Sequence, residues 1–144
     1  DNGVDGGFLQ QLLINSGVDV SYMMKKDAKN GHAIIQVTKD AKNSIFLYPG
    51  TNEMLSKEYI TRVLEGFGEQ DILMLQNETN LVDFIVEQAH AKGMRILLNP
   101  SPYNQKIKAI DLHKISCLIL NEIEGEEMAG TDNPEEILSF FEKN

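Results

Sequence analysis

The alternation of elements that decides the fold lies between residues 71 and 124, which read DILMLQNETNLVDFIVEQAHAKGMRILLNPSPYNQKIKAIDLHKISCLILNEIE. Three short apolar runs, at 71–75, 95–98 and 115–120, alternate here with segments of helical character. This alternation predicts parallel βαβ units. We therefore expect an α/β fold with a parallel sheet flanked by helices, a Rossmann-like arrangement, and right-handed crossovers between its strands.

Helix signals surround these strands. Ser56 is a good N-cap for a helix with an apolar stripe from Tyr59 to Leu64. Asn133 and Pro134 have the residue types that begin a last helix. Further helical segments are expected at 81–91, 104–113 (a short helix or a turn) and 122–129.

The N-terminal third has a different pattern. A helix containing Phe8 and Leu13 should end at Gly17, and residues 18–24 are expected to be extended. Residues 32–38 and 43–48 then predict a β-hairpin joined by residues 39–42. By the two-residue alternation, the hairpin carries apolar side chains on two faces, namely Ala33, Ile35, Val37, Ile45 and Leu47 on one and Ile34, Phe46 and Tyr48 on the other. Both faces of the hairpin are therefore expected to pack against another surface.

Composition excludes several classes of protein. The chain has 144 residues, a net charge of -9 and 42% hydrophobic residues. So acidic a chain is a poor partner for nucleic acid, and no apolar run has the ~18 residues needed to span a membrane. The single cysteine, Cys117, cannot form a disulfide framework, and its apolar surroundings predict a buried core position. We expect a cytoplasmic protein that binds neither nucleic acid nor membrane.

Polar side chains follow each of the three predicted strands. The strands end in Gln76-Asn77-Glu78, Asn99-Pro100-Ser101-Pro102 and Asn121-Glu122-Ile123-Glu124. Ligands of open α/β sheets bind beyond the carboxyl ends of the strands, so these side chains predict a site along one edge of the sheet. After any single strand, the same residue types also serve as turn residues and helix caps. No GxxxxGK[ST] loop, GxGxxG sequence or metal-type His or Cys cluster is present in the sequence.

The order of these motifs resembles the ribokinase family of carbohydrate kinases over nearly the whole chain. The likeness rests on Gly17-Val18-Asp19, Gly31-His32-Ala33, Asn43-Ser44-Ile45, Pro49-Gly50-Thr51-Asn52, Leu75-Gln76-Asn77-Glu78, Leu98-Asn99-Pro100-Ser101-Pro102 and Asn121-Glu122-Ile123-Glu124. The resemblance implies a ribokinase-like fold with a small β lid hairpin. It also implies a single partial domain over 1–144, with a lid-like segment at about 18–52 and a βα section at about 53–144. The first residues, Asp1 to Gly7, include no initiator methionine, and we expect a chain truncated at both ends.

The resemblance also implies roles for individual residues. Asn121 and Glu124 would organise the nucleotide phosphates and Mg²⁺, which Glu124 would hold through water. Asn99 would lie near the phosphates, and Glu78 would contact the sugar. Ala33, Ile35 and Ile45 would be the apolar lid positions over the sugar. Each role has a simpler alternative: an exposed first-turn glutamate for Glu124, a solvated loop charge for Glu78, and plain hairpin packing for the three lid residues.

The family begins with a strand and a sugar-binding di-glycine segment, and we expect such a segment to be missing ahead of Asp1. The family's Gly-Ala-Gly-Asp motif, which carries the catalytic base, does not occur in residues 1–144. We therefore assign no catalytic residue within the chain and expect it to be inactive alone. The parent protein would be an ATP-dependent sugar kinase, with ribose the first sugar to consider and monovalent-cation activation left open. The alternative is a non-catalytic sugar-binding or dimerisation module of the same fold. Residues 32–48 are expected to form a homodimer interface, unless Phe46 and Tyr48 fold back on the helix that starts near Ser56.

Overall fold

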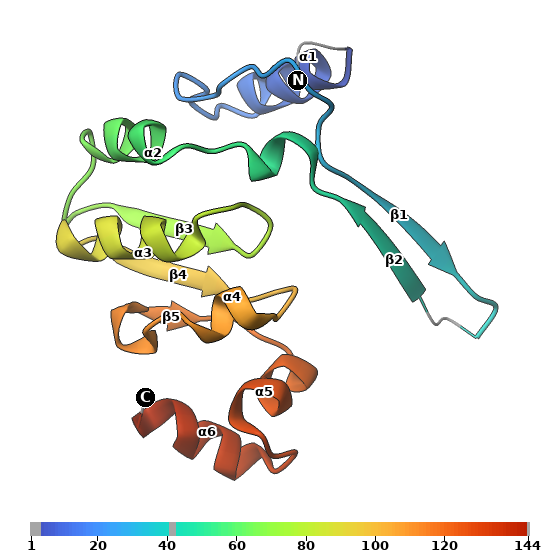
Figure 1. Ribbon diagram of the computed structural model, residues 1–144, viewed down its shortest axis with the longest axis vertical. Helices are drawn as coiled ribbons and strands as arrows, with labels where there is room; N and C mark the ends of the chain where they lie inside the picture. Colours follow the sequence, from blue (N-terminus) through green and yellow to red (C-terminus); the bar gives the residue numbers. More distant parts are fainter. Residues whose placement is uncertain (1–3, 41–42, 144) are drawn as a thin grey trace. The chain divides into compact units, whose positions relative to one another are not determined.

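The apolar runs of residues 71–120 form a three-stranded parallel sheet in the computed structural model, which describes residues 4–40 and 43–143. Its strands are β3 (Ile72–Gln76), β4 (Arg95–Asn99) and β5 (Cys117–Leu118), in the order β3-β4-β5. Figure 1 shows the three arrows pointing the same way. The predicted parallel α/β arrangement is thus confirmed, although β5 is shorter than the apolar run that predicted it.

Helices connect and cover these strands. They begin where their caps were expected: the Ser56 side chain accepts a hydrogen bond from the Tyr59 backbone N–H at 3.2 Å, and Asn133 Oδ1 accepts one from the Glu135 N–H at 2.9 Å. The helical segments of this part of the chain are α2 (Lys57–Leu64), α3 (Val82–Ala91), α4 (Gln105–Lys108), η2 (Leu112–Lys114), α5 (Glu122–Ala129) and α6 (Pro134–Lys143).

The two faces of the sheet differ in burial. Ile96 and Leu98 of β4 are fully buried, and α3, which contacts β4, contributes buried side chains such as Val86 to the same core. On the opposite face, Ile72 and Met74 are 50% and 72% exposed. This contrast defines a covered face and an open face of the sheet.

Cys117 lies on the open face, because it pairs with Leu97, which in turn pairs with Met74. Its side chain is exposed, so the prediction of a buried core cysteine is wrong. An apolar run indicates a strand but does not tell which of its two faces will be covered.

The chain divides into two compact units, Asp1–Leu55 and Ser56–Asn144. The first contains α1 (Val4–Asn15), β1 (His32–Val37), β2 (Asn43–Tyr48) and a short 3₁₀ helix, η1 (Gly50–Glu53). Helix α1 ends before Gly17, which has a φ of 77°. Residues 18–24 are not extended throughout, because a turn lies at residues 21–22, before which the Ser21 N–H donates to Asp19 Oδ1 at 2.8 Å.

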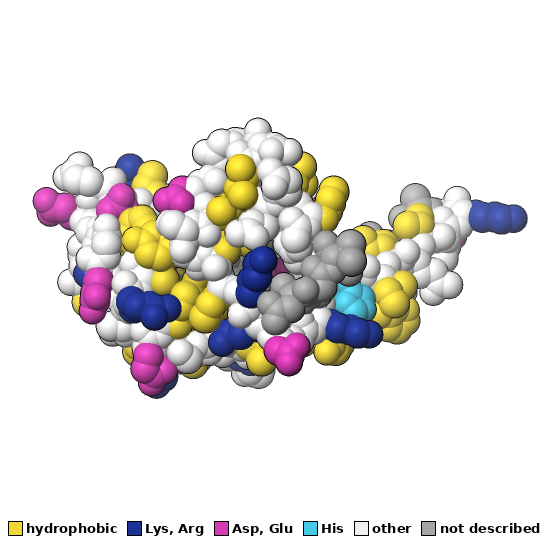
Figure 2. Space-filling model, turned by 90° about the horizontal axis from the view of Figure 1, so that it is seen from above, with side chains coloured by type: hydrophobic (Ala, Val, Ile, Leu, Met, Phe, Trp, Pro, Cys, Tyr) yellow, Lys and Arg dark blue, Asp and Glu magenta, His cyan; other side chains and the backbone are white. Residues whose placement is uncertain are grey.

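The hairpin has the predicted antiparallel pairing. Ala33 lies opposite Leu47 and Ile35 opposite Ile45, while Ile34 lies opposite Phe46 on the other face. Residues 41–42 of the predicted connection lie outside the described residues. Both faces are exposed within this chain, with Ile35 at 58% and Phe46 at 64%. Figure 2 shows hydrophobic side chains along the hairpin, at the right of the view.

Candidate functional site

The carboxyl ends of the three strands bring the predicted polar residues to one edge of the sheet. Gln76 and Asn99 are direct partners in the register of β3 and β4. Glu78 follows two residues after β3, and Asn121 follows three residues after β5, which runs parallel to β4 (Figure 1). Parallel pairing therefore gathers these side chains where α/β sheets bind ligands.

Glu78 lies in the turn between β3 and α3, and its side chain is exposed. Its neighbour Asn77 is 7% exposed and donates through Nδ2 to the carbonyl oxygen of Pro102 at 2.5 Å. The carboxylate is thus carried on a turn whose preceding residue is anchored in the protein. An accessible carboxylate can accept hydrogen bonds from sugar hydroxyls.

Asn99 shapes the loop that follows β4. Its Oδ1 accepts a hydrogen bond from the Ser101 backbone N–H at 2.9 Å, which makes the local turn expected of an asparagine. Pro100 is fully buried, and the Ser101–Pro102 peptide bond is cis. The side-chain oxygen of Asn99 therefore has a structural role, and its amide N–H groups are the atoms suited to an anionic ligand.

Asn121 and Glu124 form a capping box at the start of α5. The Glu124 N–H donates to Asn121 Oδ1 at 2.9 Å, and the Asn121 N–H donates to Glu124 Oε2 at 3.1 Å. Glu124 is 7% exposed, so the alternative of an exposed first-turn glutamate is wrong. A carboxylate has about four acceptor positions, so this one hydrogen bond does not exhaust its capacity.

The side chains at this edge fit Mg²⁺ as a partial site and not as a complete set of protein ligands. In the part of the chain that the structure describes, no three His, Cys, Asp or Glu side chains cluster as a metal cage would require. Mg²⁺, however, is commonly held by one or two carboxylates together with substrate phosphates and water. Glu124, buried at the strand-end edge, is the residue here that fits such a partial site.

The hairpin places Ala33, Ile35 and Ile45 on one face. Ile35 and Ile45 are register partners, and Ala33 lies two residues before Ile35 on the same side. The side chains of Ile35 and Ile45 are more than half exposed. The structure therefore brings the three predicted lid residues together as one apolar surface of the hairpin.

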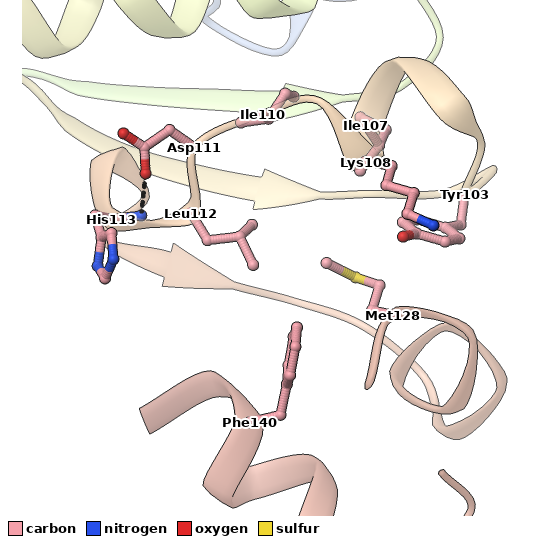
Figure 3. A pocket seen from close by; sticks show the side chains of 9 residues that line it. All are labelled: Tyr103, Ile107, Lys108, Ile110, Asp111, Leu112, His113, Met128 and Phe140. Atoms are coloured by element: carbon pink, nitrogen blue, oxygen red, sulfur yellow. Dashed lines mark hydrogen bonds between the residues drawn. The ribbon is translucent and has the colours of Figure 1, made fainter. Parts of the chain in front are cut away.

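One feature that sequence reasoning missed is a cavity of about 420 Å³ at the side of α4 and η2 (Figure 3). Leu112, Met128 and Phe140 point toward its centre from η2, α5 and α6, and Asp111 is tied back by a hydrogen bond from the His113 N–H. Its lining residues are Tyr103, Ile107, Lys108, Ile110, Asp111, Leu112, His113, Met128 and Phe140. None of the predicted site residues belongs to this set, and its centre is apolar, so it is distinct from the strand-end edge.

A second feature that the sequence did not predict is the anchoring role of Asn77, within the strand ending Gln76-Asn77-Glu78. Its position between an apolar strand and a charged residue gave no signal of burial. The partner is a backbone carbonyl 25 residues away, which only the tertiary fold brings into reach.

Parallel strands with a polar edge at their carboxyl ends, preceded by a separate β-hairpin, define a ligand-binding α/β protein. The sequence profile described as pfkB family carbohydrate kinase matches residues 3–143. The chain therefore belongs to the pfkB family of carbohydrate kinases.

Individual relatives agree with this assignment. The chain is 29% identical to the ribokinase of Haemophilus influenzae over 134 residues, which cover 91% of this chain and 44% of the relative. The crystal structure of the Cryptococcus neoformans var. grubii ribokinase in complex with ADP is similar, with 27% identity, a TM-score of 0.75, and coverage of 96% of this chain and 46% of that one. The Thermotoga maritima ribokinase gives 25% identity, a TM-score of 0.76 and coverage of 99% and 48%. The chain thus spans less than half the length of each of these relatives.

Proposed function

We propose that the protein containing these residues transfers the γ-phosphoryl group of ATP to a hydroxyl group of a sugar. The observation that carries the proposal is the polar strand-end edge with Glu78, Asn99 and Asn121 in a chain of the pfkB family. Ribose is the first sugar to test, because the relatives described above are ribokinases. Fructose-type sugars, ketodeoxy sugar acids and nucleosides are the competing acceptors.

The proposed roles follow the chemistry of each side chain. Glu78 accepts hydrogen bonds from sugar hydroxyls, and the apolar face of Ala33, Ile35 and Ile45 covers the sugar. The amides of Asn99 and Asn121 contact the nucleotide phosphates or their bound water. Phosphoryl transfer depends mainly on positioning and on electrostatic stabilisation, which are the tasks these residues can perform.

Mg²⁺ is the proposed metal, and ATP the co-substrate. The ion neutralises charge on the phosphates when it is bound. Glu124 would hold it through water, and the capping box would fix the orientation of the carboxylate while it does so. No helix among the described residues has the length and apolarity needed to cross a bilayer, and we propose a cytoplasmic enzyme.

The test is a phosphorylation assay on the protein translated from the complete reading frame around these residues. With ATP and Mg²⁺, ribose should be converted to a phosphate ester, detected by ³¹P NMR and by coupled release of ADP. A panel of fructose, a ketodeoxy sugar acid and a nucleoside serves as the comparison. Phosphorylation of none of these acceptors would contradict the proposed kinase function, and preference for another acceptor would correct the sugar alone.

A second candidate is a non-catalytic sugar-binding or dimerisation module. It is favoured by one observation: both faces of the hairpin carry exposed apolar side chains, such as Ile35 at 58% and Phe46 at 64%. Sugar binding by calorimetry without any phosphorylation by the complete protein would support this candidate.

We also propose that residues 32–48 form a homodimer interface. The register places Ile34 opposite Phe46 on one face of the hairpin and Ile35 opposite Ile45 on the other. An isolated hairpin is marginal in water, and exposed apolar surface of this kind favours association. A two-fold axis would let each copy present the same face to the other.

A further inference from the structure

Asn77 is one of the buried polar side chains at the strand-end edge, with 7% of its surface exposed. It donates a hydrogen bond through Nδ2 to the carbonyl oxygen of Pro102 at 2.5 Å. Asn77 belongs to the loop after β3, and Pro102 to the loop after β4. The hydrogen bond therefore ties together two loops that follow neighbouring parallel strands.

Both loops carry residues of the proposed site. Glu78 is the next residue after Asn77, so the anchor lies directly beside the proposed sugar-contacting carboxylate. In the other loop, Asn99 holds the backbone through its hydrogen bond with Ser101. The link from Asn77 to Pro102 thus joins the proposed sugar side of the edge to the proposed phosphate side.

The loop that carries Glu78 needs such an anchor. It ends at Leu81, whose φ of 59° is a left-handed conformation that is unfavourable for a residue other than glycine. Such a conformation persists when surrounding contacts hold it in place. The hydroxyl of Thr79, in the same loop, is buried but has no hydrogen-bond partner among the described residues, so it supplies no anchor.

We propose that Asn77 is a positioning residue of the sugar site, which acts through Glu78 by fixing the loop after β3 to the loop after β4. The inference rests on the proposed function, since that function gives Glu78 its contact with the sugar. A carboxylate that is already held in place loses less conformational freedom when the sugar binds. Asn77 therefore affects sugar affinity more than the rate of phosphoryl transfer.

The first experiment is steady-state kinetics of Asn77→Leu in the protein from the complete reading frame. Leucine has a similar size but no donor, so the Pro102 carbonyl loses its partner. The KM for the sugar should rise about 5- to 30-fold, while kcat and the KM for ATP stay near their wild-type values. Asn77→Ala is the second variant, in case leucine prevents folding. An active variant with an unchanged sugar KM would overturn the proposal.

Val86→Ala is the matched control for a general loss of stability. Val86 is 1% exposed in α3 and belongs to neither loop, so its truncation leaves a cavity in the core. It should lower the melting temperature and leave the sugar KM near the wild-type value. The same rise in sugar KM for Val86→Ala would show that the effect of Asn77 is only one of stability.

A double-mutant cycle with Glu78→Ala separates positioning from a merely structural role. If Asn77 acts through Glu78, Asn77→Leu should add little to the sugar KM once the carboxylate is absent. Full additivity would overturn the proposal.

Hydrogen exchange on the 144-residue chain tests the link without any assay of activity. Asn77→Leu should accelerate amide exchange in residues 77–81 and 100–104 together, and unchanged exchange would overturn the link itself. If the wild-type protein phosphorylates no sugar, the proposed function fails, and the positioning role fails with it even where exchange shows the link. If the wild type is active, the kinetics above decide the positioning role alone.

Discussion

At the scale of single residues, Asn121 and Glu124 combine an observed structural role with a proposed functional one. Their side chains satisfy backbone N–H groups at the start of α5, and the buried position of Glu124 limits the ways its carboxylate can turn. A capping box tolerates glutamine in place of glutamate. The cap and the charge of this position can therefore be separated by mutation.

Glu124→Gln in the protein from the complete reading frame should keep the cap and remove the charge. We expect turnover to fall by about 10- to 100-fold and the dependence on Mg²⁺ concentration to weaken, with little change in sugar KM or melting temperature. Titration of activity with Mg²⁺ measures this. Glu124→Ala, which removes the cap as well, is the comparison and should also lower the melting temperature. Unaltered turnover and Mg²⁺ dependence in Glu124→Gln would remove the metal role.

Glu78→Ala should have the opposite kinetic signature. Loss of hydrogen bonds to a charged acceptor should raise the sugar KM roughly 10- to 100-fold, and the dependence on Mg²⁺ should stay as in the wild type. Sugar saturation curves at fixed ATP and Mg²⁺ test this expectation. Normal saturation by the sugar would show that Glu78 is a solvated loop charge.

Cys117 provides a direct test of the open face of the sheet. Because its side chain is exposed on the same face of the sheet as the exposed Ile72 and Met74, the thiol of the native 144-residue chain should react with Ellman's reagent without denaturant. Cys117 should form a mixed disulfide with the reagent and release one equivalent of coloured thionitrobenzoate per chain, at a rate similar to that of a small free thiol. Reaction only after addition of denaturant would show that this face is covered in solution.

At the scale of elements, the base of the hairpin depends on a close approach between two backbone segments. The Thr51 N–H donates to the Lys29 carbonyl oxygen at 3.0 Å. A Cβ at Gly31 would lie 2.6 Å from the Pro49 oxygen, and one at Gly50 would clash with the Lys29 oxygen. Gly50 also has a φ of 52°, which other residues seldom adopt.

Gly50→Ala should therefore loosen the hairpin base, with a cost of about 1–3 kcal/mol in the free energy of unfolding. Chemical denaturation and the rate of proteolysis between residues 29 and 52 measure this effect. Gly7→Ala is the matched control in the same unit, because a Cβ there meets no atom within 4 Å and alanine favours the helix. Equal stability of the two variants would contradict the close approach.

The hairpin as an element also sets the expected oligomeric state. Phe46→Glu with Tyr48→Glu places charges on one apolar face and should convert the proposed dimer of the complete protein into a monomer. Sedimentation velocity at micromolar concentration distinguishes the two states. Lys143→Glu, exposed at the end of α6 and outside residues 32–48, is the control and should stay dimeric. A monomeric wild type, or a double mutant that remains dimeric, would contradict the proposed interface.

At the scale of the whole molecule, residues 1–144 alone should not phosphorylate a sugar. The chain contains no Gly-Ala-Gly-Asp sequence, and loss of even one anion-stabilising donor typically lowers turnover ~100-fold or more. The measurement compares the purified 144-residue chain with the protein from the complete reading frame, at equal concentration and with the same ATP, Mg²⁺ and sugar. Turnover by the shorter chain well above background would show that its own residues supply the base.

The sequence by itself determined which elements form and the order in which they follow one another. The apolar runs predicted β3 and β4 to within one residue, and Ser56 and Asn133 marked helix starts correctly, because caps and alternating side chains are local effects. The paired faces of the hairpin followed from the same two-residue alternation. The edge that gathers Glu78, Asn99 and Asn121 was also predictable, since parallel strands end on the same side.

Only the tertiary structure decided which surfaces are covered and which distant groups meet. It exposed Cys117, buried Glu124, and brought Asn77 to the carbonyl oxygen of Pro102. Burial depends on which face of a strand a helix covers, and α3 contacts β4, whose Ile96 and Leu98 are buried. The hydrogen bond from Asn77 to Pro102, 25 residues away, depends on the paths of the loops after β3 and β4. Loop paths leave no periodic signal in a sequence. Local sequence signals therefore predict the elements and their ends, whereas the contacts between elements are known only from the tertiary structure.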